Sequence, residues 1–208
     1  MSENSAAKPT FTHLHVHSHY SLLNALPQIP DLVKAAKEMG LTSLALTDNG
    51  NLYGAIEFYK ECKKKEIKPI LGIDAYLAPR TRHDKDHGID NPRQRLVLLA
   101  KDAQGSKSLI KLVTDAHLEG FYYKPRVDKE ILEKYKEGLV AISPAMAGDI
   151  AQAVMMKDFD KAKTLIEWYR GVFGSENFFI EISLNQCSKR SLAFHPFKIN
   201  HFIFSFQW

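Results

Sequence analysis

The chain has 208 residues, of which 45% are hydrophobic and 25% are charged, an ordinary composition for a soluble globular protein. This length suits one substantial domain and is short for two. The formal net charge is +4, but the segment after Glu181 has no acidic residue and carries Lys189, Arg190 and Lys198, so the rest of the chain sums to +1. We therefore expect no dedicated basic face for nucleic acid in the main body.

Cysteine usage and the absence of apolar runs indicate the compartment. Cys62 and Cys187 give neither a disulfide framework nor a Cys-x-x-Cys metal spacing, which fits a reducing environment. Residues 1–8 lack an apolar signal core, and no run approaches the roughly 20 apolar residues that span a bilayer. The sequence predicts a cytoplasmic protein without a membrane partner.

Strand and helix patterns alternate along the chain, which predicts an α/β fold built from βα units around a parallel sheet, either a barrel or a doubly wound sheet. In the predicted helix 53–67, Ile56, Tyr59 and Lys60 are spaced one turn apart. A polar loop is expected at 79–92. The expected strands are 10–17, 43–47, 70–77, 96–100, 139–143 and 178–183, and the other expected helices are 31–39, 106–118, 128–135, 147–156 and 161–173.

The C-terminal segment has a different composition. Residues 186–208 hold five of the twelve phenylalanines and Trp208, with no acidic residue and no helix cap. We expect an appended terminus that exposes an aggregation-prone segment. A final hydrophobic strand is the alternative.

Histidines alternate with apolar residues near the start of the chain, at His13, His15 and His17. In a strand, residues i, i+2 and i+4 line one face, and neutral imidazole is a common metal ligand. Asp48 and Asn49 follow the second predicted strand and Asp74 lies in the third, and α/β folds collect ligands at the C-terminal ends of their strands. A metal site is one interpretation; a polar strand face or hydrogen-bonded core histidines are the other, and Asp48 reads better as a turn or capping residue.

Several segments together resemble the PHP (polymerase and histidinol phosphatase) domain at the N-terminus of bacterial DNA polymerase III α subunits. They are Phe11–Ser18, Tyr20–Leu23, Ala45–Ala55, Glu57–Tyr59, Ile67–Gly72, Leu96–Lys101 and Glu119–Arg126. The resemblance implies a distorted seven-stranded (β/α) barrel over 11–184, incomplete at its C-terminus with about six strands present. Residues 1–10 are then a polar N-terminal tail, and 185–208 a divergent tail outside the resemblance.

The resemblance also implies a metal site that has lost part of its ligands. It assigns direct metal contact to His15, His17 and Asp74, with His13 supporting a ligand. Neutral or cationic residues occupy the remaining ligand positions of the family, namely Asn24, Asn49, Arg95 and Ala145. A guanidinium is permanently charged and opposes a bound cation unless it pairs with Asp74. We therefore expect no ion, or one weakly bound divalent ion such as zinc or manganese.

Three functions follow as hypotheses. The first is a scaffold within a replicative DNA-directed DNA polymerase, a nucleotidyltransferase whose polymerase site lies outside this chain. Its partners are then the remainder of the α subunit, the proofreading exonuclease subunit, and DNA through the parent polymerase. The alternative is a metal-dependent phosphoesterase or 3′–5′ exonuclease acting through the two histidines and Asp74. The third, a small-molecule phosphatase of the histidinol-phosphate type, requires a complete ligand set, which this sequence lacks.

Overall fold

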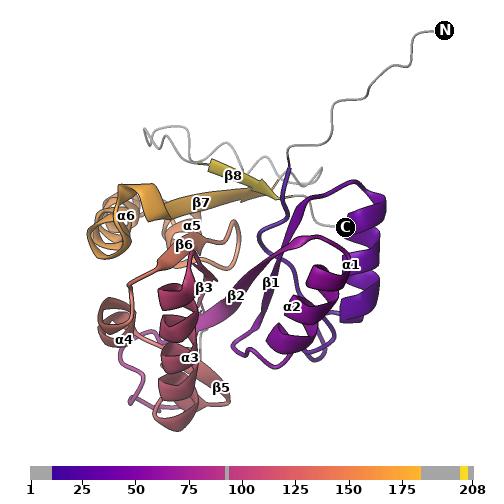
Figure 1. Ribbon diagram of the computed structural model, residues 1–208. Coiled ribbons are helices and arrows are strands. Elements are labelled where there is room, and N and C mark those ends of the chain that lie inside the picture. The colour runs from indigo at the N-terminus through magenta and orange to yellow at the C-terminus, as the bar shows by residue number, and fades with distance from the viewer. Residues whose placement is uncertain (1–10, 92–93, 184–201, 206–208) are drawn as a thin grey trace, which may run out of the picture.

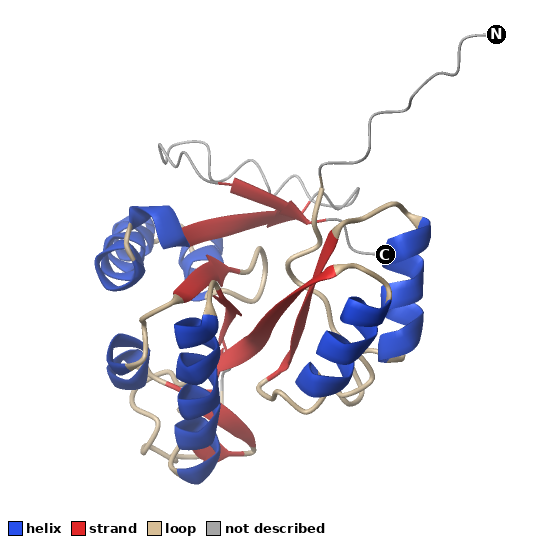
Figure 2. Ribbon diagram, viewed as in Figure 1, coloured by secondary structure: helices blue, strands red, loops and turns tan. Residues whose placement is uncertain are grey.

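The computed structural model describes residues 11–91, 94–183 and 202–205, and these form the α/β architecture expected from the sequence (Figures 1 and 2). Helices lie on the outside of one curved mixed sheet. The strands are β1 Ser43–Asn49, β2 Lys68–Leu77, β3 Gln94–Ala100, β4 Phe121–Tyr122, β5 Lys124–Val127, β6 Leu139–Ser143, β7 Phe178–Ser183 and β8 Phe202–Ser205. The helices are α1 Ile29–Glu38, α2 Ala55–Lys64, α3 Ala103–Leu118, α4 Lys129–Lys134, α5 Asp149–Met155 and α6 Phe159–Phe173, with a short 3₁₀ turn η1 at Ser175–Asn177.

The expectation of an all-parallel sheet is wrong. β1 pairs parallel with β2, and β6, β7 and β8 run parallel to one another, but β3 is antiparallel to both of its neighbours, β2 and β6. The cause is the connection before β3, because residues 78–91 contain no helix. A parallel crossover usually needs a helix, whereas a polar loop can return the chain directly beside the strand it left.

The predicted strand at 10–17 is also wrong over the described residues 11–17, which are extended but irregular. This segment runs beside β1, with Ala45 N donating to His13 O at 3.0 Å and Thr47 N to Val16 O at 2.8 Å. The Thr47 hydroxyl accepts from Val16 N at 2.9 Å, which occupies the donor that a regular ladder would pair with backbone. The alternation of residue types in the sequence cannot show that a side-chain hydroxyl takes the place of a backbone acceptor here.

Two groups of helices cover the sheet. α1 and α2 pack against β1 and β2 over a core that includes Ile29, Val33 and Phe58. The larger core lies under α3 to α6, around Leu98, Leu112 and Ile150. Asp102, Asp128 and Asp158 cap α3, α4 and α6 by accepting hydrogen bonds from backbone N–H groups of the first turn. These caps fix where three helices begin.

Two further local expectations need revision. α2 is shorter than the predicted helix 53–67, and it buries Phe58 and Cys62 while Ile56 and Tyr59 are exposed. The short hairpin of β4 and β5 was not expected beside the turn at Gly120. In the C-terminal tail, β8 extends the sheet beyond β7, while 184–201 and 206–208 lie outside the described residues.

Candidate functional site

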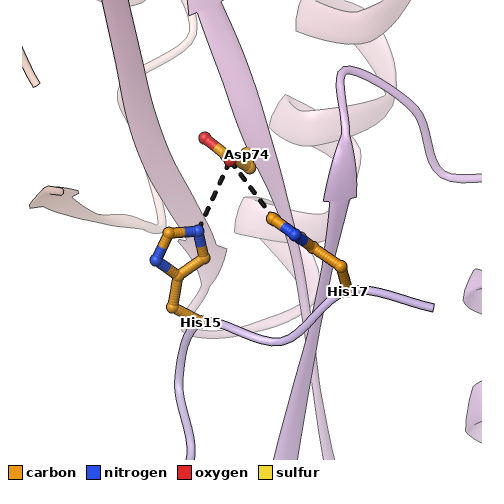
Figure 3. A group of neighbouring side chains, drawn as sticks. All are labelled: His15, His17 and Asp74. Atoms are coloured by element: carbon orange, nitrogen blue, oxygen red, sulfur yellow. Dashed lines mark hydrogen bonds and ion pairs between the residues drawn. The ribbon is translucent and has the colours of Figure 1, made fainter. Parts of the chain in front are cut away.

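Three side chains converge at one end of the sheet: His15 and His17 from the extended N-terminal segment, and Asp74 from β2 (Figure 3). Their nearest ligand atoms all lie within 4.8 Å of one another. Asp74 Oδ2 is 3.4 Å from His15 Nε2 and 3.3 Å from His17 Nε2. One carboxylate oxygen therefore faces both imidazoles.

Asp48 at the end of β1 fixes the turn that follows the histidines. It is buried, and its carboxylate accepts from Ser18 N at 2.7 Å, from the Ser18 hydroxyl at 2.7 Å and from the Ser21 hydroxyl at 2.6 Å. These bonds use both carboxylate oxygens. Asp48 therefore acts as the turn residue that the sequence favoured, and it holds His17 in place through the adjacent Ser18.

Arg95 reaches the same site from β3. Its Nη1 donates to Asp74 Oδ2 at 2.6 Å and also to the side-chain oxygen of Asn49, which lies opposite Asp74 in the β1–β2 register. The guanidinium is stacked over the ring of Tyr76, 4.3 Å from its centroid. Asn49 and Arg95 stand at two positions where the family resemblance places metal ligands. Here Arg95 contacts both Asp74 and Asn49.

Glu181 of β7 is a site residue that sequence reasoning missed. Its Oε2 accepts from His15 Nδ1 at 2.9 Å, and the residue is 5% exposed. The sequence feature that could have pointed to Glu181 is its place as the single carboxylate in the apolar run Phe178–Ile182, since a charged residue is rarely buried without a partner. Through His15, the N-terminal segment contacts both β2 and β7, which are separated by β3 and β6 in the strand order.

The electrostatics of the site follow from these contacts. Burial alone would lower the pKa of His15, but its hydrogen bonds to Asp74 and Glu181 outweigh burial and raise the pKa to about 10. Burial alone would raise the pKa of Asp74, yet the hydrogen bond from His15, the close approach of His17 and the charges of His15 and Arg95 hold it well below its usual range. A protonated His15 can donate from both ring nitrogens, to Asp74 and to Glu181, and in that state it has no lone pair for a metal.

The other assigned positions lie farther from this centre. His13 and Asn24 line a cavity of about 960 Å³ together with His15, His17 and Glu181. Burial lowers the pKa of His13, and its ring meets that of Phe11 edge-on at 4.8 Å. Asn24 donates to Leu22 O at 3.3 Å, and Ala145 lies in the turn after β6 with no ligand atom to offer. Within the described residues, His13 is not part of the metal-capable group.

Sequence comparison identifies the family. The PHP domain model matches residues 13–185, so the chain belongs to the PHP domain family. Among curated proteins it is 47% identical over 173 residues to the DNA polymerase III subunit alpha of Borreliella burgdorferi, covering 83% of this chain and 15% of that subunit. The subunits of Chlamydia trachomatis and Aquifex aeolicus are 42% and 39% identical over 185 and 189 residues, covering 88% of this chain and 15% and 16% of those subunits.

The chain is thus homologous to DNA polymerase III α subunits and spans about 15% of the length of the curated relatives it matches. Among solved structures, an amidohydrolase from Chromobacterium violaceum gives a TM-score of 0.44 at 12% identity, covering 82% of this chain and 84% of that one. In the part of the chain that the structure describes, no helix is both long and apolar enough to cross a membrane.

Proposed function

We propose that this chain is the PHP part of a replicative DNA polymerase III α subunit and serves there as a cytoplasmic scaffold with a degenerate metal site. The observation that carries the proposal is the pairing of two basic side chains with two carboxylates: Arg95 and His15 both contact Asp74, and His15 also contacts Glu181. Such a cluster offsets the charge of its carboxylates without a metal ion. The 47% identity to the Borreliella burgdorferi subunit supports the polymerase context.

The residues fit one weakly held ion and no multi-ion cluster. His15, His17 and Asp74 would be its ligands, and the buried Asp74 Oδ1, which accepts no hydrogen bond among the described residues, offers a further donor atom. The Arg95 guanidinium lies 2.6 Å from Asp74 Oδ2, so a divalent ion would meet a permanent positive charge. Asn49 and Ala145, at former ligand positions, add no anionic ligand. Zinc or manganese is the ion we propose for such weak binding.

The partners that we propose are the remainder of the α subunit, the proofreading exonuclease subunit, and DNA held by the parent polymerase. A second candidate function, a metal-dependent phosphoesterase or 3′–5′ exonuclease, is favoured by one observation: the His15, His17 and Asp74 group has metal-capable geometry. This function requires His15 to release its proton and Arg95 to leave Asp74. We therefore rank it second.

Metal content and hydrolysis decide between the two functions. The purified 208-residue chain is equilibrated with zinc or manganese, dialysed, and analysed for bound metal. It is then assayed in manganese for phosphate release from a phosphomonoester and for nucleotide release from a 3′-labelled oligonucleotide. The scaffold predicts less than one retained ion per chain and no activity above that of His15→Ala. Two tightly held ions, or hydrolysis that His15→Ala abolishes, would establish the alternative instead.

A chimera tests the polymerase context. The region of the Borreliella burgdorferi α subunit that matches this chain is replaced by residues 13–185. We expect the chimera to fold and to extend a primed template, whereas a subunit lacking the region loses stability. Failure of the chimera to replace the native region, with the native subunit active in parallel, contradicts the scaffold role.

A further inference from the structure

Helix α2 has apolar side chains on two opposite faces. Phe58 and Cys62 are fully buried against the core shared with α1 and β1. Ile56 and Tyr59 lie on the opposite face, where they are 68% and 46% exposed. A surface helix normally has one apolar face, toward its own core, so the second face calls for a separate explanation.

We define the α2 outer stripe as Ile56, Tyr59, Lys60 and Lys63, which are spaced i, i+3, i+4 and i+7 and so share one helix face. Figure 1 shows α2 on the outside of β1 and β2, beside α1. Three of its members, Ile56, Tyr59 and Lys60, are the residues whose one-turn spacing is visible in the sequence. The structure directs that face away from the core.

The charge of the stripe is positive. Within the described residues neither Lys60 nor Lys63 forms an ion pair, and Lys63 Nζ lies 5.7 Å from the centroid of the Tyr59 ring. The carboxylates of the same helix are engaged elsewhere: Glu57 accepts from the Tyr20 hydroxyl at 3.2 Å, and Glu61 pairs with Lys64 at 3.7 Å. Two ammonium groups therefore border an apolar centre.

We propose that the α2 outer stripe is a docking face for a polypeptide surface with an apolar centre and an acidic rim. This inference rests on the proposed function, because the occupant is the part of the α subunit that lies beyond the 15% matched by this chain. Exposed Ile56 and Tyr59 provide the area that becomes buried, and Lys60 and Lys63 select an acidic complement. Single-stranded DNA fits less well, since the stripe has a single aromatic ring, that of Tyr59, and the more exposed Ile56 cannot stack on a base.

Binding to a trimmed subunit tests the inference directly. The probe is the Borreliella burgdorferi α subunit without its matched region, immobilised, with the 208-residue chain in solution at about 0.05 M and about 0.5 M NaCl. The double variant Ile56→Ser/Tyr59→Ser should weaken binding about tenfold or more at both salt concentrations. Lys60→Glu/Lys63→Glu should weaken it mainly at low salt. Ile110→Ser, at a 58% exposed position on α3, is the matched control and should change binding less than twofold.

The chimera provides a second measurement that does not depend on the trimmed subunit folding alone. In the chimera, Ile56→Ser/Tyr59→Ser should lower the melting temperature and primer extension relative to Ile110→Ser, while leaving the melting temperature of the isolated 208-residue chain unchanged. Equal behaviour of the two variants in the chimera overturns the docking face and leaves the scaffold role standing. An inactive chimera, with its stripe intact, instead counts against the proposed function.

Binding of nucleic acid to the α2 outer stripe is the remaining alternative to be tested. Binding of an oligodeoxythymidine to the 208-residue chain is measured with the same variants. Binding that Lys60→Glu/Lys63→Glu abolishes and Ile56→Ser/Tyr59→Ser leaves intact would assign the stripe to DNA and overturn the inference. Weak oligonucleotide binding, equal for all variants, supports the polypeptide partner.

Discussion

Arg95 on β3 donates to Asp74 on β2 at 2.6 Å, joining two antiparallel strands at the centre of the candidate site. Asp74 is 3% exposed, and the side chain of Arg95 is 18% exposed. A carboxylate so deeply buried depends on its cationic partners. The pair therefore links the stability of the fold directly to the chemistry of the site.

Replacing Arg95 by alanine should destabilise the protein by about 3 kcal/mol, because it leaves the Asp74 carboxylate without the cation that lies nearest to it, at 2.6 Å. The measurement is the free energy of unfolding in urea. Arg170→Ala, at an exposed position near the end of α6, is a control that should cost less than about 0.5 kcal/mol. Equal losses for the two variants would show that the Asp74–Arg95 pair adds nothing to stability.

Stability should fall as the pH rises from neutral into the alkaline range. The folded state raises the pKa of His15 from 6.5 to about 10, so its contribution is complete below pH 6.5 and is lost as the pH rises toward 10. Urea midpoints measured at several pH values across this interval report the slope.

Two substitutions separate His15 from the other titrating groups. His15→Gln should remove most of the slope, whereas His117→Gln, at a histidine of α3 that contacts Val113 O at 2.9 Å, should retain it. A slope that persists unchanged in His15→Gln contradicts the assignment of a stabilising imidazolium.

Tyr169→Phe should destabilise the protein by about 1–3 kcal/mol, because the buried Asp149 loses the hydroxyl that donates to it at 2.7 Å. Burial raises the pKa of Asp149, which marks the cost of its ionised form in this position. Tyr135→Phe is the matched control: its hydroxyl donates to Asp115 at 2.8 Å, but that carboxylate is more exposed. The control should lose less free energy of unfolding than Tyr169→Phe, and the reverse order would refute the argument.

Two glycines in helices should respond in opposite directions to alanine. A Cβ at Gly105 would lie 2.0 Å from the carbonyl oxygen of Gly138, so Gly105→Ala should cost about 1–3 kcal/mol. Gly171 in α6 has open space around the added Cβ, so Gly171→Ala should stabilise by about 0.5–1 kcal/mol through helix propensity. Thermal unfolding of both variants, scanned side by side, gives the sign of each change.

Most helices and five strands could be predicted from the sequence, because apolar periodicity and aspartate caps are local signals. The strand at 10–17 could not be predicted correctly, since its ladder is interrupted by a hydroxyl from Thr47, a residue thirty-one positions from Val16. Whether β3 runs parallel or antiparallel to β2 depends on the path of the loop before it. The composition of that loop shows that it is polar but does not predict its path. Ile56 and Tyr59 showed helical spacing, but spacing cannot say which of two apolar faces meets the core.

The sequence by itself determined the α/β class, the family resemblance and the residue types available to the site: two imidazoles, a carboxylate and a guanidinium. Tertiary structure alone decided their pairing, because Glu181 lies 166 positions from His15 and meets it across the strand order. Charge interactions depend on distance in space and on burial, and the local sequence predicts neither quantity. In that pairing His15, a candidate metal ligand, lies between two carboxylates.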